Sequence, residues 1–136
     1  MAVTNGVTPN GKTVLLIDDD LSIRKVVRMR LERAGYRVCA AEGGEEGLRL
    51  AKRERPSVIL LDLQMPTMDG REVLKRLKDD PVTRPIPVIL LSVVGTTDEM
   101  YVPMGSGQAA NLSKPYQPHE LLREIQAVLT ERRSTS

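Results

Sequence analysis

The sequence contains few aromatic, cysteine and histidine residues. Among its 136 residues there is no phenylalanine or tryptophan, so a core has to be built mainly from leucine, isoleucine, valine, alanine and methionine. The single cysteine, Cys39, excludes an internal disulfide and fits a reducing compartment. The single histidine, His119, leaves no basis for a zinc site made of several histidine and cysteine ligands.

The sequence also lacks long apolar segments and a strong excess of charge. No apolar run approaches the roughly 20 residues that a membrane-spanning helix needs, and residues 1–12 lack the apolar core of a signal peptide. The formal net charge of +2 is too small to indicate binding to nucleic acid or to an acidic membrane. We therefore expect a cytoplasmic protein with no direct nucleic-acid partner and no membrane insertion.

What the sequence does contain is an alternation of short apolar runs, typical of buried strands, with longer segments that have apolar residues at helical spacing. The predicted strands cover residues 13–17, 37–41, 58–62, 86–94 and 111–114. The predicted helices cover residues 21–35, 45–55, 71–80 and 118–133. This alternation indicates an α/β domain with a doubly wound, five-stranded parallel sheet in the flavodoxin-like order 2-1-3-4-5 and helices on both faces. We expect one domain over residues 13–133, a flexible tail over 1–12 and a frayed end over 134–136.

Polar residues occupy the carboxyl ends of four predicted strands, where a doubly wound sheet places its ligands. They are Asp18, Asp19, Asp20, Asp62, Ser92 and Lys114. Burying an unpaired carboxylate is costly, so Asp62, which ends the run VILLD, is interpreted as part of a site rather than of the core. Three acids after a strand could by themselves merely begin a helix, with Asp20 or Ser22 as its N-cap. The joint placement at four strand ends favours a site.

The residue types at these strand ends indicate the chemistry. Clustered carboxylates without histidine or cysteine suit a hard cation with oxygen ligands, Mg²⁺ before Zn²⁺, because the ion relieves the repulsion between them. A lysine beside them suits an anion with several oxygen atoms, and a serine hydroxyl adds a neutral donor. Together they indicate a phosphoryl site, in which a carboxylate can act as the nucleophile and become an aspartyl-phosphate.

With these residues, the sequence resembles the receiver domains of bacterial two-component response regulators, of the single-domain type. The resemblance extends over roughly residues 13–130. It rests on the segments LLIDDD, VILLDLQMPTMDG, IPVILLS and LSKPY, which occur in the order and at the spacing found in that family. No single segment is specific, but the combination is.

The resemblance implies a role for most of the polar residues. Asp62 would accept a phosphoryl group from a sensor histidine kinase or a histidine phosphotransfer protein. Mg²⁺ would bind to Asp19, Asp62 and the backbone carbonyl of Gln64, with Asp18 acting in the outer shell of the ion or through water. Lys114 would contact a phosphoryl oxygen.

The resemblance also implies how the surroundings of the phosphoacceptor behave. Ser92 would move to bond the phosphoryl group on activation. The Lys114–Pro115 peptide bond would be cis. The Met65–Pro66 turn and Gly70 would shape the loop beside the phosphoacceptor.

The sequence departs from the family pattern three residues before Lys114. The family usually has an aromatic side chain there, which turns inward on activation, whereas this chain has Asn111. Tyr101 and Tyr116 are the candidates to substitute for it.

A second departure concerns the segment before the last strand, where the family has its fourth helix. Pro103 would break an interior helical turn at a cost of about 3 kcal/mol, and Gly105 and Gly107 weaken a helix further. We therefore expect an irregular or mobile fourth helix over residues 98–108, which leaves the usual output face in doubt.

The sequence leaves several functions open. The leading one is a stand-alone phospho-accepting switch, since the chain ends after its last predicted helix; output would then pass through an unknown downstream protein or by phosphorelay. A pseudo-receiver acting as a constitutive protein-binding module is favoured by Asn111 and by the broken fourth helix, and is opposed by the intact acidic site. A third function, a hydrolase of the haloacid-dehalogenase kind, needs an aspartate where Gln64 stands. A flavin-binding module is disfavoured, because the clustered acids would repel the phosphate of a flavin. We expect no enzyme activity beyond the domain's own phosphorylation and slow dephosphorylation.

Overall fold

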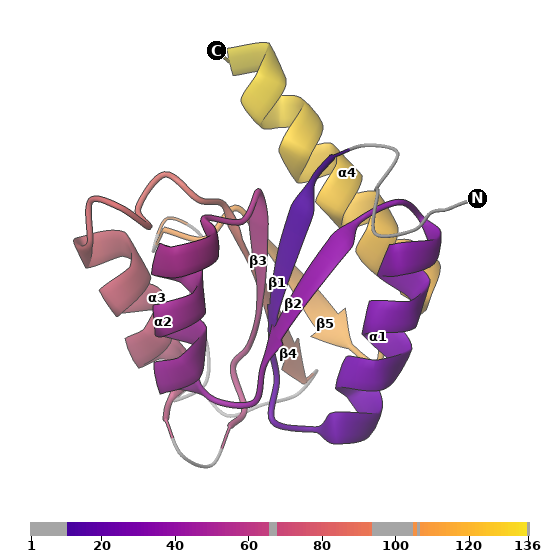
Figure 1. The fold of residues 1–136 in the computed structure, drawn as a ribbon, viewed down its shortest axis with the longest axis horizontal. Helices are drawn as coiled ribbons and strands as arrows, with labels where there is room; N and C mark the ends of the chain where they lie inside the picture. The colour runs from indigo at the N-terminus through magenta and orange to yellow at the C-terminus, as the bar shows by residue number, and fades with distance from the viewer. Residues whose placement is uncertain (1–10, 66–67, 94–104, 106, 136) are drawn as a thin grey trace.

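The computed structural model describes residues 11–65, 68–93, 105 and 107–135 (Figure 1). Strands and helices alternate along the described part of the chain, as the apolar pattern predicts, except that no helix is described between the last two strands. In order, the elements are β1 (Thr13–Ile17), α1 (Leu21–Arg33), β2 (Arg37–Ala41), α2 (Gly44–Glu54), β3 (Val58–Asp62), α3 (Gly70–Asp79), β4 (Val88–Val93), β5 (Ala110–Lys114) and α4 (Pro118–Thr135).

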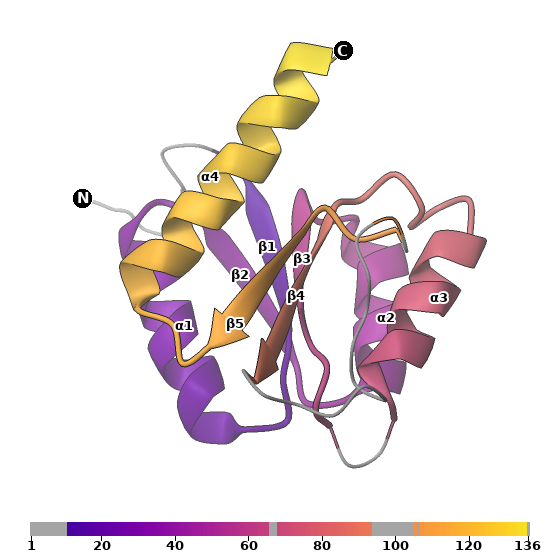
Figure 2. The same ribbon diagram turned by 180° about the vertical axis from the view of Figure 1, so that it is seen from behind.

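The five strands form one parallel sheet in the order β2-β1-β3-β4-β5, which confirms the predicted order. Helices α1 and α4 cover one face and α2 and α3 cover the other (Figures 1 and 2). The strands run side by side with their carboxyl ends at one edge. In the register, Ile17 lies opposite Leu61, and Asp62 lies opposite Leu91. The first and third strands therefore deliver their terminal residues to adjacent places.

The core has two layers, one on each face of the sheet. Successive residues of a strand point to opposite faces, so Leu15 packs toward α2 and α3, while Leu16 packs toward α1 and α4. All five residues of β3 are buried, as expected for a central parallel strand that is covered on both faces. Burial of each leucine or isoleucine contributes roughly 1.5–3 kcal/mol to stability. Asp62 therefore ends a strand whose residues are all buried.

The helix ends differ from the predicted ones by one or two residues, for local reasons. Helix α1 ends at Arg33 rather than at 35 because the chain leaves it in a left-handed turn at Gly35, with a φ of 98°. In that turn the Gly35 amide donates to the Glu32 carbonyl and the Tyr36 amide to the Leu31 carbonyl, both at 3.0 Å. Helices α2 and α3 each begin one residue before the predicted start, at a glycine, and end one residue before the predicted end.

Two predictions about the last elements are wrong at their boundaries. Strand β4 begins at Val88 rather than at 86, because the Ile86 amide donates to the Thr83 carbonyl (3.0 Å) in the preceding turn and Pro87 has no amide hydrogen. Helix α4 extends to Thr135, so it passes the predicted end at 133 and includes two of the three residues expected to fray.

Some predictions fall wholly or mainly outside the described residues. These are the flexible tail, of which residues 1–10 are not described, and the irregular fourth helix, of which only Gly105, Gly107 and Gln108 are described. The two glycines have left-handed φ values of 103° and 113° and are not helical. Among the described helices, none has the length and apolar content needed to cross a membrane.

Candidate functional site

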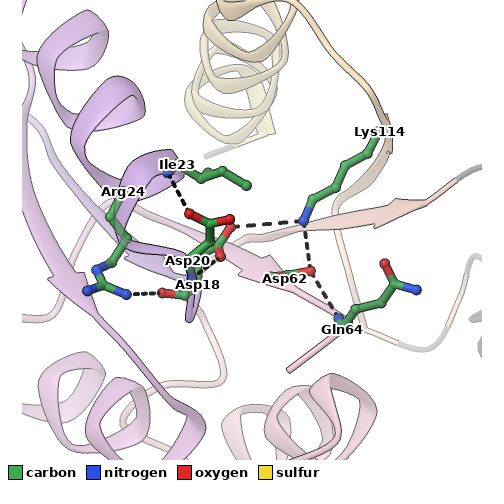
Figure 3. A network of polar contacts seen from close by, with 7 residues as sticks. All are labelled: Asp18, Asp20, Ile23, Arg24, Asp62, Gln64 and Lys114. Atoms are coloured by element: carbon green, nitrogen blue, oxygen red, sulfur yellow. Dashed lines mark hydrogen bonds and ion pairs between the residues drawn. The ribbon is translucent and has the colours of Figure 1, made fainter. Parts of the chain in front are cut away.

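Four residues from three strand ends come together at the carboxyl edge of the sheet, and Figure 3 shows three of them, Asp18, Asp62 and Lys114. Asp18 and Asp19 directly follow β1, Asp62 ends β3 and Lys114 ends β5. One carboxylate oxygen from each of the three aspartates lies within 4.8 Å of the other two. The Lys114 ammonium lies 3.1 Å from Asp62 Oδ1 and 4.0 Å from Asp18 Oδ2. Residues that are far apart in the sequence thus form one compact charged cluster.

The turn after β1 directs its three acids in different ways. Asp20 is the N-cap of α1 and accepts a hydrogen bond from the Ile23 amide at 3.1 Å, so of the two predicted caps it is Asp20 rather than Ser22 that begins the helix. Asp18 is fully buried, and its Oδ1 accepts from the Asp20 amide at 2.9 Å. Asp19 is exposed. One turn therefore supplies a helix cap, a buried acid and an exposed acid.

Asp62 is held by two donors that approach the same oxygen. Its Oδ1 accepts from the Gln64 amide at 3.0 Å and lies 3.1 Å from the Lys114 ammonium. The residue is only 2% exposed. A buried carboxylate with charged and backbone donors keeps a single orientation, because a charge-assisted hydrogen bond is stronger than a neutral one.

Asp18 has an electrostatic environment that a cation would improve. Burial raises the pKa of Asp18 above its ordinary value, the negative charges of Asp62 and Asp19 raise it further, and the Asp20 amide and Lys114 lower it. Its Oδ2 is buried without a hydrogen-bond partner. A buried oxygen of this kind is costly unless something satisfies it. The three aspartates therefore fit a hard divalent cation such as Mg²⁺, which takes oxygen ligands and would offset their repulsion.

The loop beside Asp62 depends on a glycine. A Cβ atom added at Gly70 would lie 2.6 Å from the Leu63 Cα and 2.9 Å from the Asp62 carbonyl oxygen, both of which are backbone atoms. No larger residue fits without moving the end of β3, in agreement with the expectation that Gly70 shapes this loop. Met65 is buried beside it, whereas Pro66 lies outside the described residues.

Of the other predicted site residues, Gln64 contacts the cluster through its backbone amide, and Ser92 has no described contact to it. Ser92 is half-buried in β4, one residue beyond the partner of Asp62 in the register. Gln64 is exposed, and the binding role of its backbone carbonyl stays a prediction, as does the movement of Ser92. The Lys114–Pro115 bond is cis, as expected.

The surroundings of Asn111 differ from the aromatic position that the family has there. Asn111 is exposed, and its Oδ1 accepts from the Gln108 side chain at 3.3 Å. Of the two tyrosines considered as substitutes, Tyr101 lies outside the described residues. Tyr116 is half-buried close to the site, where burial, followed by the charges of Asp18 and Asp62, raises its pKa to about 12.

Arg24 also contacts the site, although it belongs to none of the motifs that predict the site from the sequence. Its guanidinium donates to the Asp18 carbonyl at 2.8 Å (Figure 3). In the sequence this arginine is one of several basic residues of α1, and only the turn after β1 brings it back to Asp18. Cys39 is half-buried and His119 is exposed, and neither belongs to the cluster.

Comparison with known proteins identifies a family. The family model described as "Response regulator receiver domain" matches residues 14–126. The phosphate regulon transcriptional regulatory protein PhoB of Pseudomonas aeruginosa is 36% identical over 119 residues, which are 88% of this chain and 52% of that protein. This chain thus spans about half the length of the curated relatives that it matches first.

Solved structures agree with the family match. A CheY-like receiver domain protein from Methanospirillum hungatei superposes with a TM-score of 0.84 at 28% identity, covering 92% of this chain and 98% of that chain. The receiver domain of the sensor histidine kinase PA1611 from Pseudomonas aeruginosa has a TM-score of 0.80 at 28% identity, covering 88% and 98% of the two chains. That structure is described as having a magnesium ion coordinated in the active site cleft.

Proposed function

The chain belongs to the response regulator receiver domain family of two-component signalling, and from this membership we propose that it is a phospho-accepting switch whose phosphoacceptor is Asp62. Accepting a phosphoryl group is the general function of the family, and receiver domains interact with histidine kinases or phosphotransfer proteins. A receiver domain is not a conventional enzyme. The specific donor, the site residues and the output are the parts that we propose here.

The observation that carries the proposal is the position of Asp62 beside both the ammonium of Lys114 and the acids of the β1 turn. Asp62 is the carboxylate that ends the central strand, and Lys114 lies 3.1 Å from it. A carboxylate fixed beside a cation and a divalent-ion site can attack phosphorus, because the charge on the transferred group is neutralised there. Asp18 and Asp19 would hold Mg²⁺ together with Asp62 and the Gln64 carbonyl, and the bound ion would neutralise the phosphoryl oxygens.

The transfer proposed is from a phosphohistidine of the donor protein. A carboxylate oxygen of Asp62 forms a bond to phosphorus, while the phosphorus–nitrogen bond breaks and its electron pair returns to the imidazole. Lys114 binds a phosphoryl oxygen, and the Gln64 amide keeps Asp62 oriented. Ser92 then moves to bond the phosphoryl group. A cytoplasmic location, which the lone Cys39 fits, is part of the proposal.

Intact-mass measurement tests the phosphoacceptor. The chain is incubated with Mg²⁺ and a small phosphodonor, and we expect one added phosphate that hydroxylamine removes. Asp62→Asn should remove the added mass and leave the fold intact, because the amide oxygen can still accept from Gln64. Asp79→Asn, an acid on the exposed side of α3 paired with Lys75, is the matched control and should be labelled like the wild type. Labelling of Asp62→Asn at the wild-type level would refute the assignment.

The output is proposed to be the binding of a downstream protein or the onward transfer of the phosphoryl group. Curated relatives are transcriptional regulators about twice as long as the matched region, so the partner of this chain is not identified by them.

A second function, a constitutive binding module, is favoured by one observation. Asn111 is exposed, accepts a hydrogen bond from the side chain of the buried Gln108 and offers no aromatic ring to turn inward. The labelling experiment separates the two functions, because a pseudo-receiver would take up no phosphate under conditions in which a related receiver domain does.

A further inference from the structure

Arg24 links three elements at the edge of the acidic cluster. It lies in the first turn of α1, and its side chain is only 15% exposed. One guanidinium nitrogen donates to the Asp18 carbonyl at 2.8 Å, and the other terminal nitrogen lies 3.7 Å from a carboxylate oxygen of Glu42, in the loop after β2. The side chain thus spans α1, the end of β1 and the β2–α2 loop.

The bond from Arg24 goes to the backbone between two of the clustered acids. Strand β1 ends at Ile17, and the Asp18 carbonyl begins the peptide unit that leads to Asp19. Because a peptide unit is planar, fixing this carbonyl fixes the direction in which the chain enters Asp19. The Asp18 side chain is fixed separately, by the Asp20 amide at 2.9 Å. The exposed Asp19 carboxylate has no comparable restraint of its own in the described contacts, so its position depends on its backbone.

We propose that Arg24 is a positioning residue of the cation site, which holds the Asp18–Asp19 peptide so that the two carboxylates face Asp62 before an ion binds. The inference rests on the proposed function of the acidic cluster. Arg24 does not touch the ion or the phosphoryl group. Groups that orient metal ligands in this way typically change metal affinity by about 10–100-fold when they are removed.

A second arginine of the same helix provides a matched control. Arg28, one turn further along α1, also donates to a strand carbonyl at 2.8 Å, that of Val38 in β2. Val38 pairs with Val14, near the start of β1 and away from the carboxyl edge. Both arginines connect α1 to the sheet through a hydrogen bond, but of the two only Arg24 does so next to the acidic cluster. A purely structural role predicts the same behaviour for both.

The test measures Mg²⁺ affinity by titration calorimetry on the whole chain, without phosphodonor. We expect Arg24→Gln to weaken Mg²⁺ binding roughly tenfold or more. Arg28→Gln should leave the Mg²⁺ affinity within about twofold of the wild-type value. Both variants should lower the urea midpoint by similar amounts. A lysine at this position can still donate to the Asp18 carbonyl but cannot contact Glu42 at the same time. Arg24→Lys should therefore have an Mg²⁺ affinity between those of the wild type and Arg24→Gln. If Arg24→Gln does not fold, Arg24→Lys compared with Arg28→Lys decides the question.

Unchanged Mg²⁺ affinity in the Arg24 variants, or an equal loss in the Arg28 variants, would overturn the inference. Phosphorylation of the wild-type chain is measured separately. A wild type that binds Mg²⁺ but takes up no phosphate would refute the proposed function and leave the role of Arg24 standing. A labelled wild type whose Arg24 variants bind Mg²⁺ normally would refute only the role of Arg24.

Discussion

Asp18, Asp19 and Asp20 are neighbours in the chain, but their side chains have different surroundings. Asp20 caps α1, Asp19 is exposed, and Asp18 is fully buried with one oxygen lacking a hydrogen-bond partner. The buried one is the residue whose ionisation the fold opposes, since burial is the largest cause of its raised pKa. The difference between the three arises from the direction of the turn, not from the residue type.

Asp18 should make stability depend on pH when no divalent cation is present. A carboxyl whose pKa is raised in the folded state binds its proton more tightly there than in the unfolded chain. Its stabilising contribution is therefore full below the ordinary value of 3.8 and is lost as the pH rises through the folded-state pKa. We expect Asp18→Asn to be more stable than the wild type at pH 7 in a chelating buffer, and the gain to disappear near pH 3.

Urea unfolding of both proteins at the two pH values checks this expectation. Asp20→Asn is the control, because asparagine is also a good N-cap and should shift stability little at either pH. A gain for Asp18→Asn that is the same at pH 3 and pH 7 would mean that shape rather than charge is responsible.

At the scale of elements, the first residue of a helix limits how closely that end of the helix packs against its neighbours. Helices α2 and α3 both begin at a glycine, but the two glycines face different obstacles. A Cβ at Gly44 would meet side-chain atoms, the nearest being Met68 Sδ at 2.5 Å, whereas a Cβ at Gly70 would meet the backbone of Leu63 and Asp62. A side chain can rotate away more easily than a central strand can shift.

We therefore expect Gly70→Ala to be more destabilising than Gly44→Ala. Overpacking typically costs about 1–3 kcal/mol, and Gly70→Ala should lie at the upper end of this range. It should also slow phosphorylation, because the strand end that it displaces carries Asp62. The urea midpoints and the labelling rates of the two variants are the measurements, and a larger loss of stability for Gly44→Ala would contradict the backbone argument.

At the scale of the whole molecule, a cation bound by residues from β1 and β3 should stabilise the entire fold. An ion that binds only the native state adds about 1.4 kcal/mol at roughly ten times its dissociation constant. We expect millimolar Mg²⁺ to raise the thermal midpoint of the wild type. Asp19→Ala should remove most of this increase, because it removes one of the three clustered carboxylates.

The control is Asp79→Ala, which removes an exposed acid of α3 that is ion-paired with Lys75 and lies outside the cluster. It should keep the full response to Mg²⁺. A response that Asp79→Ala and Asp19→Ala lose equally would show that the stabilisation comes from general screening of charge.

Patterns in the sequence are enough to predict the strands, their order in the sheet and the edge at which the site lies. Apolar spacing separates strands from helices because a strand repeats every two residues and a helix every 3.6. Once the alternation indicates a doubly wound parallel sheet, the carboxyl ends of its strands have to meet at one edge. That rule alone brings Asp18, Asp62 and Lys114 together, and the structure places their charged groups within reach of one another.

Tertiary packing, in contrast, sets which acid is buried, which arginine of α1 reaches the cluster, and where the helices end. Three consecutive aspartates are equivalent in a pattern, since their burial depends on how the turn lies against strands that come later in the chain. Arg24 and Arg28 are both basic residues of one helix and look alike in the sequence. The packing of α1 on the sheet places Arg24 beside the acids, whereas Arg28 hydrogen-bonds to β2. Likewise, α1 ends at a left-handed turn at Gly35 that is held by backbone hydrogen bonds, and the spacing of apolar residues does not predict these bonds. Spacing along the chain specifies which residues share a face or an edge, whereas contacts a few ångströms long depend on the packing of elements that are distant in sequence.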